Sequence, residues 1–219
     1  MSDFTLVIGN KNYSSWSLRP WLLMTQAGID FREIRIPLYE QNSKAQILKY
    51  SPSGKVPALI DGDVTIWDSL AICEYLAERF PQKQLWPADA KARALARSIS
   101  AEMHSSFNEL RANMPFNGRK RLPGKGRTPA VMKDIERVAQ IWNQCRNQYG
   151  STGPFLLGGF SIADAMYAPV ALRFVTYVVP LDAVAAAYVE TIEKLPAVQR
   201  WLEAGRAETE TIASSEPYA

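Results

Sequence analysis

The chain has 219 residues, of which 47% are hydrophobic and 21% charged, and its formal net charge is +3. This composition is typical of a globular protein with one large domain or two small ones, and so mild a charge does not indicate a nucleic-acid-binding protein. The first residues have no signal-peptide pattern and no apolar run approaches membrane-spanning length, so we expect a cytoplasmic protein without a membrane partner.

The first 80 residues alternate between strand and helix patterns. In chain order we expect a strand over 5–8, a helix over 17–27, a strand over 31–36, a short helix or irregular turn over 43–50, strands over 58–60 and 64–67, and a helix over 69–80. Gly28 is a typical helix stop, and Asp61-Gly62-Asp63 between two apolar runs is typical of a hairpin. The order predicts a βαβ unit followed by a ββα unit.

After Pro81 only helical periodicity remains. The spacing of apolar residues predicts helices over 88–114, 129–149, 161–175, 181–192 and 197–207. Ser161 and Asp164 match a capping box, which predicts that the third of these helices starts there and is buried at the centre of its domain. The change of pattern predicts two domains, over residues 1–80 and 91–219, joined by a linker over 81–90.

Several hydroxyl groups lie where the first strand turns into the first helix. The segment reads Tyr13-Ser14-Ser15-Trp16-Ser17-Leu18-Arg19-Pro20 and directly follows the apolar strand. Unpaired N–H groups and the positive end of the helix dipole favour an anion at such a place, and a thiolate is one such anion. Because no cysteine lies nearby, any thiolate there must belong to a ligand. Simple helix capping by the serines is the alternative interpretation.

Two further junctions combine turn chemistry with a possible binding role. Val56-Pro57 precedes the hairpin, and a cis bond there would turn the backbone of Val56 toward an extended peptide ligand, whereas a trans bond is the ordinary case. Asp68-Ser69 opens the next helix, where the pair is suited to helix capping. The same carboxylate and hydroxyl also suit the ammonium and carboxylate of a free amino-acid end.

The remaining polar residues argue against other chemistry. His104 is the only histidine, and we expect it partly exposed on a helix surface, with a position beside a cleft as the alternative. Cys73 and Cys145 lie within helical patterns and in no metal-ligand spacing, so we expect buried thiols and no metal site. The basic stretch Arg119-Lys120-Arg121 indicates a solvated loop, or else a positive rim that attracts acidic substrates.

Taken together, these motifs resemble those of the cytosolic glutathione S-transferases over nearly the whole chain. The resemblance rests on the strand-helix order of residues 1–80, Val56-Pro57, Asp68-Ser69, the capping box and the all-helical second half. It implies a thioredoxin-like glutathione-binding domain followed by an all-α domain. The segment with Ser14, Ser15 and Arg19 is most similar to the Ser-Ser-Cys-x-x-Arg pattern of the zeta class, except that Trp16 replaces the cysteine.

The resemblance implies a detoxifying enzyme that adds glutathione, its co-substrate, to a small electrophile. By family, Ser14 is the first choice to donate a hydrogen bond to the glutathione thiolate, and Ser15 is the close alternative. The backbone of Val56 would pair with the cysteinyl part of glutathione, and Lys55 would approach its glycyl carboxylate. Asp68 and Ser69 would hold its γ-glutamyl end.

The same resemblance implies an electrophile pocket between the domains and leaves other activities open. The pocket would be lined by Trp16, Met103, His104, Phe107 and Arg111, with Trp16 suited to flat aromatic compounds. The replaced cysteine counts against the zeta-type isomerase. Glutathione-dependent isomerase, peroxidase and dehalogenase activities, and a non-catalytic protein on the same fold, remain alternatives. Most members of the family are symmetric dimers, so a homodimer is expected.

Overall fold

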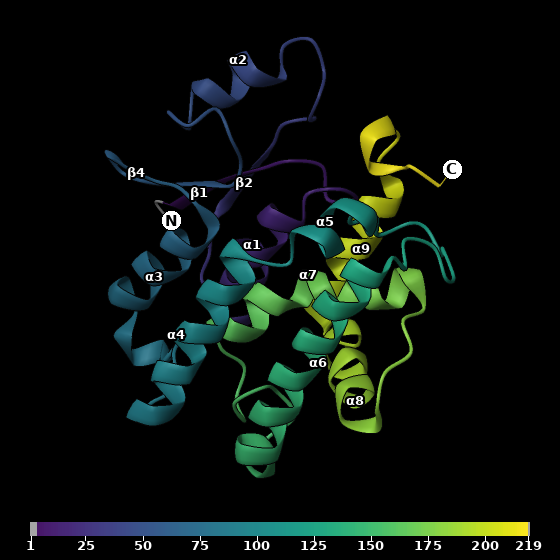
Figure 1. Cartoon of the computed structure of the whole chain (residues 1–219). Coiled ribbons are helices and arrows are strands. Elements are labelled where there is room, and N and C mark those ends of the chain that lie inside the picture. The colour runs from purple at the N-terminus through teal and green to yellow at the C-terminus, as the bar shows by residue number, and fades with distance from the viewer. Residues whose placement is uncertain (1–3, 219) are drawn as a thin grey trace.

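The computed structural model describes residues 4–218 and consists of a small sheet with flanking helices followed by a set of helices (Figure 1). The first part holds β1 (Phe4–Ile8), α1 (Ser15–Gln26), β2 (Arg32–Arg35), α2 (Ser43–Leu48), β3 (Ala58–Asp61), β4 (Val64–Ile66) and α3 (Ser69–Arg79). The second part holds α4 (Ala90–Ser105), α5 (Asn108–Asn113), α6 (Pro129–Tyr149), α7 (Ile162–Tyr177), α8 (Ala183–Glu193) and α9 (Pro196–Ala207). No helix within residues 4–218 is both long and apolar enough to span a membrane.

The four strands form one mixed sheet in the order β2-β1-β3-β4. β1 pairs with β2 in parallel and with β3 in antiparallel orientation, and β3 and β4 form the predicted hairpin. Side chains alternate between the faces of β1: Leu6 and Ile8 enter the large core, whereas Val7 joins a small cluster with Ile47 of α2. This is the predicted thioredoxin-like arrangement, and it leaves the start of α1 beside β1.

One hydrophobic core runs through both halves of the chain. It includes residues of β1, α1 and α3 as well as residues of α4, α6, α7, α8 and α9. α7 is buried at every position except Val175, and it packs against α1, α4 and α8. Its first turn has the predicted capping box of Ser161 and Asp164. The predicted domain bounds at residues 80 and 91 stay a prediction, because this core is shared.

Several predicted helix bounds are wrong. α7 ends at Tyr177 rather than at residue 175, and α8 begins at Ala183 rather than at residue 181. α1 begins at Ser15, with Ser14 as its N-cap, two residues before the predicted start at Ser17. The helix predicted over 88–114 is two helices, α4 and α5, separated at Phe107, whose φ is +61°. Apolar spacing continues across the break, so the periodicity does not reveal it. Arg111 supports the break by donating hydrogen bonds to the main-chain carbonyls of Met103, His104 and Ser106.

Candidate functional site

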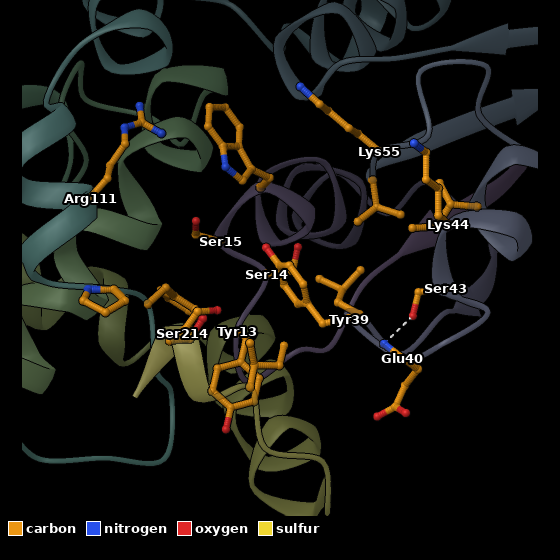
Figure 2. Close-up of a pocket in the computed structure, with 18 of the residues that line it drawn as sticks. Tyr13, Ser14, Ser15, Tyr39, Glu40, Ser43, Lys44, Lys55, Arg111 and Ser214 are labelled. Carbon is orange, nitrogen blue, oxygen red and sulfur yellow. Dashed lines mark hydrogen bonds between the residues drawn. The ribbon is translucent and has the colours of Figure 1, made fainter. Parts of the chain in front are cut away.

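Two adjoining cavities lie between the sheet-bearing half and the helices of the second half. The first has a volume of about 700 Å³, and its wall joins the start of α1 to Lys44 of α2 and Arg111 of α5 (Figure 2). The second has a volume of about 570 Å³ and lies at the start of α3. Trp16, Lys55 and Val56 line both cavities. The two cavities therefore form adjacent parts of one candidate site.

Ser14 and Ser15 both line the first cavity, but their hydroxyl groups have different partners. Ser14 Oγ accepts a hydrogen bond from the backbone N–H of Ser17 at 3.3 Å, as an N-cap does, and donates one to Ser17 Oγ at 2.8 Å. Ser15 Oγ accepts a hydrogen bond at 3.3 Å from Nη2 of Arg173, which belongs to α7. Each serine is 6% exposed. Ser14 thus caps the helix, as the alternative interpretation predicted, while Ser15 is linked to the second half.

Trp16 separates the two cavities and is held by charged neighbours. The guanidinium carbons of Arg19 and Arg111 lie 4.2 Å and 4.7 Å from its ring centroid, and the His104 ring meets it edge-on at 5.4 Å. Cation–π contacts of this kind contribute roughly 0.5–2 kcal/mol each. Because two guanidiniums already lie against the indole, Trp16 is less available as a stacking surface for a flat substrate than the sequence suggests.

Two buried arginines bring positive charge to the site: Arg173 lines the first cavity, and Arg19 lies behind it, where the charge of Asp68 partly offsets its own. Arg19 is 1% exposed and Arg173 is 5% exposed, and within residues 4–218 neither has a carboxylate at ion-pairing distance. Burial is the largest cause that lowers the pKa of each to about 9, and the positive charge of Arg111 adds to the effect. Buried charges without a partner are unfavourable. An anionic ligand in the first cavity would therefore be stabilised.

Asp68 is both the N-cap of α3 and a wall of the second cavity. Its Oδ1 accepts hydrogen bonds from the backbone N–H groups of Leu70 and Ala71 at 3.0 Å and 3.2 Å. Its Oδ2 lies 2.6 Å from Nε2 of His104. Ser69, the first residue of α3, lines the same cavity, and its Oγ accepts a hydrogen bond from Arg19. The capping interpretation is confirmed, and the carboxylate also faces the cavity.

His104 is partly exposed on α4, as predicted, and it also lies on the wall of the second cavity. Burial lowers the pKa of its imidazole, and this effect exceeds the opposing attraction of Asp68. Because the ordinary pKa of histidine is near 6.5, the imidazole is neutral at neutral pH and its Nε2–H donates to the carboxylate. The side chain then orients Asp68 instead of carrying a charge.

The Val56-Pro57 bond is cis, the form that a binding role for Val56 required. Val56 and Lys55 lie on the wall shared by the two cavities, between Ser15 and Asp68. Figure 2 shows Lys55 on the side of the cavity opposite Arg111. The predicted residues Ser14, Ser15, Lys55, Val56, Asp68 and Ser69 therefore all line one or both cavities.

Met103 and Phe107 do not line either cavity, so their predicted place in the electrophile pocket is wrong. Met103 is fully buried and Phe107 is 5% exposed, and both belong to the hydrophobic core. Their spacing along the helix marked the core-facing side, which a sequence pattern does not distinguish from a cavity-facing side. Trp16 and His104 line the second cavity, and Trp16 and Arg111 line the first.

The basic stretch at residues 119–121 lies in a loop with Lys120 and Arg121 exposed to solvent, as the first interpretation predicted, and it does not line the two cavities. Arg119 donates to the main-chain carbonyl of Glu208 at 2.6 Å and to the hydroxyl of Tyr13 at 2.7 Å. The hydroxyl of Tyr13 in turn donates to Glu216 at 2.5 Å. The stretch therefore ties the carboxyl-terminal segment to the loop before α1.

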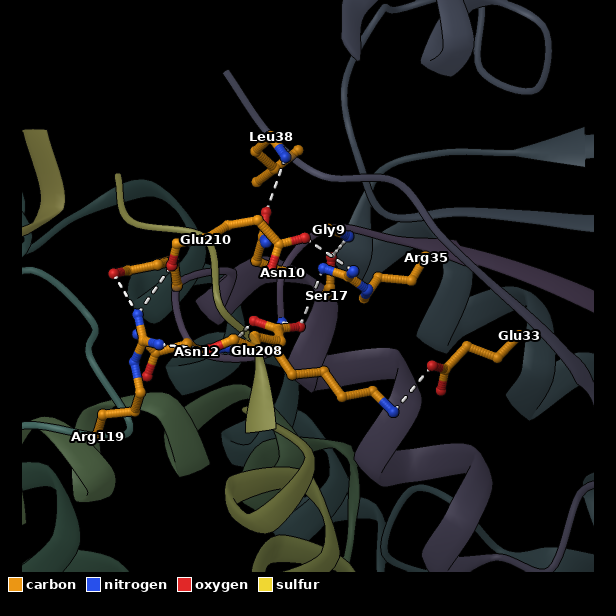
Figure 3. A network of polar contacts seen from close by, with 12 residues as sticks. Gly9, Asn10, Asn12, Ser17, Glu33, Arg35, Leu38, Arg119, Glu208 and Glu210 are labelled. Atoms are coloured by element: carbon orange, nitrogen blue, oxygen red, sulfur yellow. Dashed lines mark hydrogen bonds and ion pairs between the residues drawn. The ribbon is translucent and has the colours of Figure 1, made fainter. Parts of the chain in front are cut away.

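Glu208 holds that same loop through its side chain. Its carboxylate accepts hydrogen bonds from the backbone N–H groups of Lys11 at 2.7 Å and Asn12 at 3.0 Å, and Figure 3 shows this network together with Arg119. Arg35 of β2 pairs with both Glu208 and Glu210. Hydrogen bonds to a charged group contribute roughly 1.5–3 kcal/mol each. The carboxyl-terminal segment thus fixes the residues that lead into Ser14 and Ser15.

Arg173 is the site residue that sequence reasoning missed. It is the one arginine or lysine in α7, whose other residues are almost entirely apolar or small. The sequence did contain a signal for it: a single arginine in a helix predicted to be buried needs a specific partner, and this could have indicated a site residue. Its contact with Ser15 joins residues 158 positions apart, which no local pattern reveals.

The described residues 4–218 contain no group of three or more His, Cys, Asp or Glu side chains that could hold a metal ion. Cys73 and Cys145 are free, buried thiols, and burial raises the pKa of Cys145 to about 12. Neither thiol lines the two cavities. The charged and polar side chains on the cavities are mainly hydroxyls and cations, together with His104 and the carboxylates of Asp68 and Glu40, a set suited to a zwitterionic ligand.

Comparison with protein families gives two matches that cover most of the chain. Residues 13–79 match the glutathione S-transferase N-terminal domain, and residues 91–204 match the glutathione S-transferase C-terminal domain. The chain belongs to the glutathione S-transferase family. The protein is thus an enzyme of the glutathione transferase type, and the fold implied by the sequence resemblance is confirmed.

Curated relatives include zeta-class members of the family. Glutathione S-transferase Z2 of Arabidopsis thaliana is 28% identical over 199 residues, which covers 86% of this chain and 88% of the relative. A maleylacetoacetate isomerase of Rattus norvegicus is 39% identical over 101 residues, which covers 44% and 46% of the two chains. The resemblance to the zeta class is therefore confirmed at the level of similarity.

Solved structures give the same fold. A glutathione transferase homologue from Burkholderia, solved with bound glutathione, has a TM-score of 0.70 and 25% identity, and the match covers 94% of this chain and 99% of that one. Poplar glutathione transferase F1 has a TM-score of 0.69 at 19% identity, with 95% and 100% coverage. The latter similarity concerns the fold alone.

Proposed function

We propose that this glutathione transferase binds glutathione across the two adjoining cavities and ionises its thiol at the start of α1. The observation that carries the proposal is the continuity of the site: Ser15 and Asp68 lie on cavities that share Lys55 and Val56 as a common wall. A tripeptide with a γ-glutamyl end, a thiol and a carboxylate needs a site with separate groups for each. Glutathione is the bound ligand in the similar Burkholderia structure.

The tripeptide is proposed to lie with its γ-glutamyl end at the start of α3. Asp68 would accept a hydrogen bond from its ammonium group, and Ser69 would hold its α-carboxylate. The cysteinyl part would pair with the backbone of Val56, as an added strand pairs with a sheet edge. Lys55 would approach the glycyl carboxylate, and the thiol would then face Ser14 and Ser15.

Ionisation of the thiol requires only modest stabilisation. A free thiol has a pKa near ~8.5, and a shift of one unit corresponds to ~1.4 kcal/mol. A hydroxyl hydrogen bond to the thiolate contributes roughly 1.5–3 kcal/mol, and the helix terminus contributes roughly 0.5–1 kcal/mol. Together these effects would lower the thiol pKa by about 1.5 to 3 units, to a value of roughly 5.5 to 7, so that half or more of the thiol is ionised at neutral pH.

The first cavity is proposed to hold the electrophile. The thiol proton leaves to solvent, the sulfur electron pair forms a bond to the electrophilic carbon, and the leaving group departs with its bonding electrons. Isomerisation uses the same thiolate, and the similarity to maleylacetoacetate isomerases favours it as the second candidate. Trp16 at the position of the zeta-class cysteine is the feature that favours conjugation instead.

We further propose a cytoplasmic homodimer.

Retention on glutathione-agarose followed by a chlorodinitrobenzene assay tests the proposed function. We expect the protein to bind the resin, to elute with free glutathione and to release chloride as it forms the dinitrophenyl conjugate. Retention without turnover of this or a maleylacetoacetate-type substrate would favour a non-catalytic carrier. A protein that does not bind the resin, and shows no heat of glutathione binding in calorimetry, would contradict the proposal.

A further inference from the structure

The carboxyl-terminal segment, residues 208–218, forms part of the wall of the first cavity. Ile212, Ser214 and Ser215 line this cavity, and none of these three lines the second. The two serines belong to a single 3₁₀ turn, Ala213–Ser215, and Ser214 is exposed. The match to the family's C-terminal domain ends at residue 204. This side of the cavity is therefore built by a part of the chain that the family match does not cover.

Hydrogen bonds hold the segment on both sides of the residues that line the cavity. Before them, Arg119 donates to the main-chain carbonyls of Glu208 at 2.6 Å and Glu210 at 2.9 Å. After them, the carboxylate of Glu216 accepts from the hydroxyl of Tyr13 at 2.5 Å, and this hydroxyl accepts from Arg119 at 2.7 Å. The hydrogen bond from Tyr13 is the largest cause that lowers the pKa of Glu216, so the carboxylate is ionised at neutral pH. Arg119 thus links the two ends of the stretch that lines the cavity.

The segment lies beside the space that the electrophile is proposed to occupy. Figure 2 shows Ser214 on the same side of the cavity as Arg111 and across from Lys55. Lys55 is the proposed partner of the glycyl carboxylate of glutathione. The γ-glutamyl end is proposed to bind in the second cavity, whose lining includes no residue of the segment. The segment therefore borders the electrophile rather than glutathione.

We propose that this segment limits the size of the electrophile, with Ser214 and Ser215 as specificity-determining residues and Arg119 as a positioning residue that holds them in place. The inference rests on the proposed function and specifies which part of the chain selects the second substrate. Two short side chains leave room at this wall for a small electrophile. The backbone, held at both ends, excludes a larger one by steric overlap, which is a common source of specificity.

A larger side chain at the wall tests the inference first. We expect Ser214→Phe to lower kcat/KM for chlorodinitrobenzene by about 10- to 100-fold, because the ring would fill the space of the electrophile. The dissociation constant of glutathione, measured by calorimetry, should stay at the wild-type value. Ser151→Phe is the matched control, because Ser151 is also an exposed serine in a single 3₁₀ turn, Gly150–Thr152, and lines neither cavity. It should leave both quantities unchanged.

Release of the segment tests the same wall in the opposite direction. Arg119→Met removes the hydrogen bonds to Glu208, Glu210 and Tyr13. We expect the ratio of kcat/KM for the bicyclic chloronitrobenzofurazan to that for chlorodinitrobenzene to rise about tenfold. Arg146→Met is the control, because Arg146 also donates to main-chain carbonyls and lines neither cavity, and it should leave the ratio at the wild-type value.

Two results would overturn the inference alone. One is a wild-type kcat/KM of Ser214→Phe for both electrophiles, and the other is a loss of glutathione affinity in this variant as large as its loss of kcat/KM. An unchanged ratio in a folded Arg119→Met variant would remove Arg119 from the account, and should that variant not fold, Ser214→Phe still decides the matter. Wild-type protein that does not bind glutathione, or that converts neither electrophile, would overturn the proposed function itself and the inference with it.

Discussion

Replacement of Asp68 by asparagine should weaken glutathione binding by about 10- to 100-fold. The change removes a negative charge that the ammonium of the γ-glutamyl group would meet, and a charged hydrogen bond of this kind is worth roughly 1.5–3 kcal/mol. The asparagine oxygen can still accept from the N–H groups of Leu70 and Ala71, so the cap of α3 is retained. The free energy of unfolding should therefore change little.

Asp89→Asn provides the matched control for this measurement. Asp89 caps α4 by accepting from the backbone N–H of Ala92 at 2.8 Å, and it lies on neither cavity. Isothermal titration calorimetry with glutathione should give wild-type affinity for this variant and a much weaker affinity for Asp68→Asn. Equal affinity of the Asp68→Asn variant and the wild type would show that the γ-glutamyl end binds elsewhere.

Replacement of Asp164 by alanine should be the most destabilising single change in the second half, by about 3–5 kcal/mol. The carboxylate is fully buried and accepts from Leu156 N at 3.0 Å, Ser161 N at 2.9 Å, Ser161 Oγ at 3.0 Å and Tyr188 OH at 3.2 Å. Alanine would leave these buried donors without partners. Such a loss is a large share of the roughly 5–15 kcal/mol that stabilises a typical protein.

Urea denaturation of Asp164→Ala and Asp182→Ala compares a buried cap with an exposed one. Asp182 caps α8 by accepting from the N–H groups of Val184 and Ala185 at the surface. Its loss should cost about 1 kcal/mol, the usual effect of removing an N-cap. If the two variants lose the same free energy of unfolding, the buried network around Asp164 does not hold the second half together.

The fold was predictable where local chemistry decides it. The bounds of α6 agree with the predicted 129–149, because Pro129 at its start and an uninterrupted apolar stripe define the helix. The hairpin at Asp61-Gly62-Asp63 and the capping box at Ser161 depend on neighbours a few positions apart. Each of these features is encoded in residues close together in the chain.

Features that depend on distant contacts were not predictable. The break at Phe107 depends on a local contact and was missed as well, because the hydrogen bonds of Arg111 to the end of α4 leave no trace in the apolar spacing. The contact of Arg173 with Ser15 and the attachment of Glu208 to the loop before α1 arise only when the two halves pack together. Sequence reasoning thus located the serines and Asp68, and could not show that Ser14 caps α1 while Ser15 contacts Arg173.

A crystal structure of this protein with glutathione tests the central claim most directly, namely that the thiol binds and ionises at the start of α1. We expect the sulfur within hydrogen-bonding distance of Ser14 Oγ or Ser15 Oγ, the γ-glutamyl ammonium on Asp68 and the cysteinyl backbone paired with Val56. A tripeptide bound with its sulfur beyond the reach of both Ser15 and Ser14 would contradict the account.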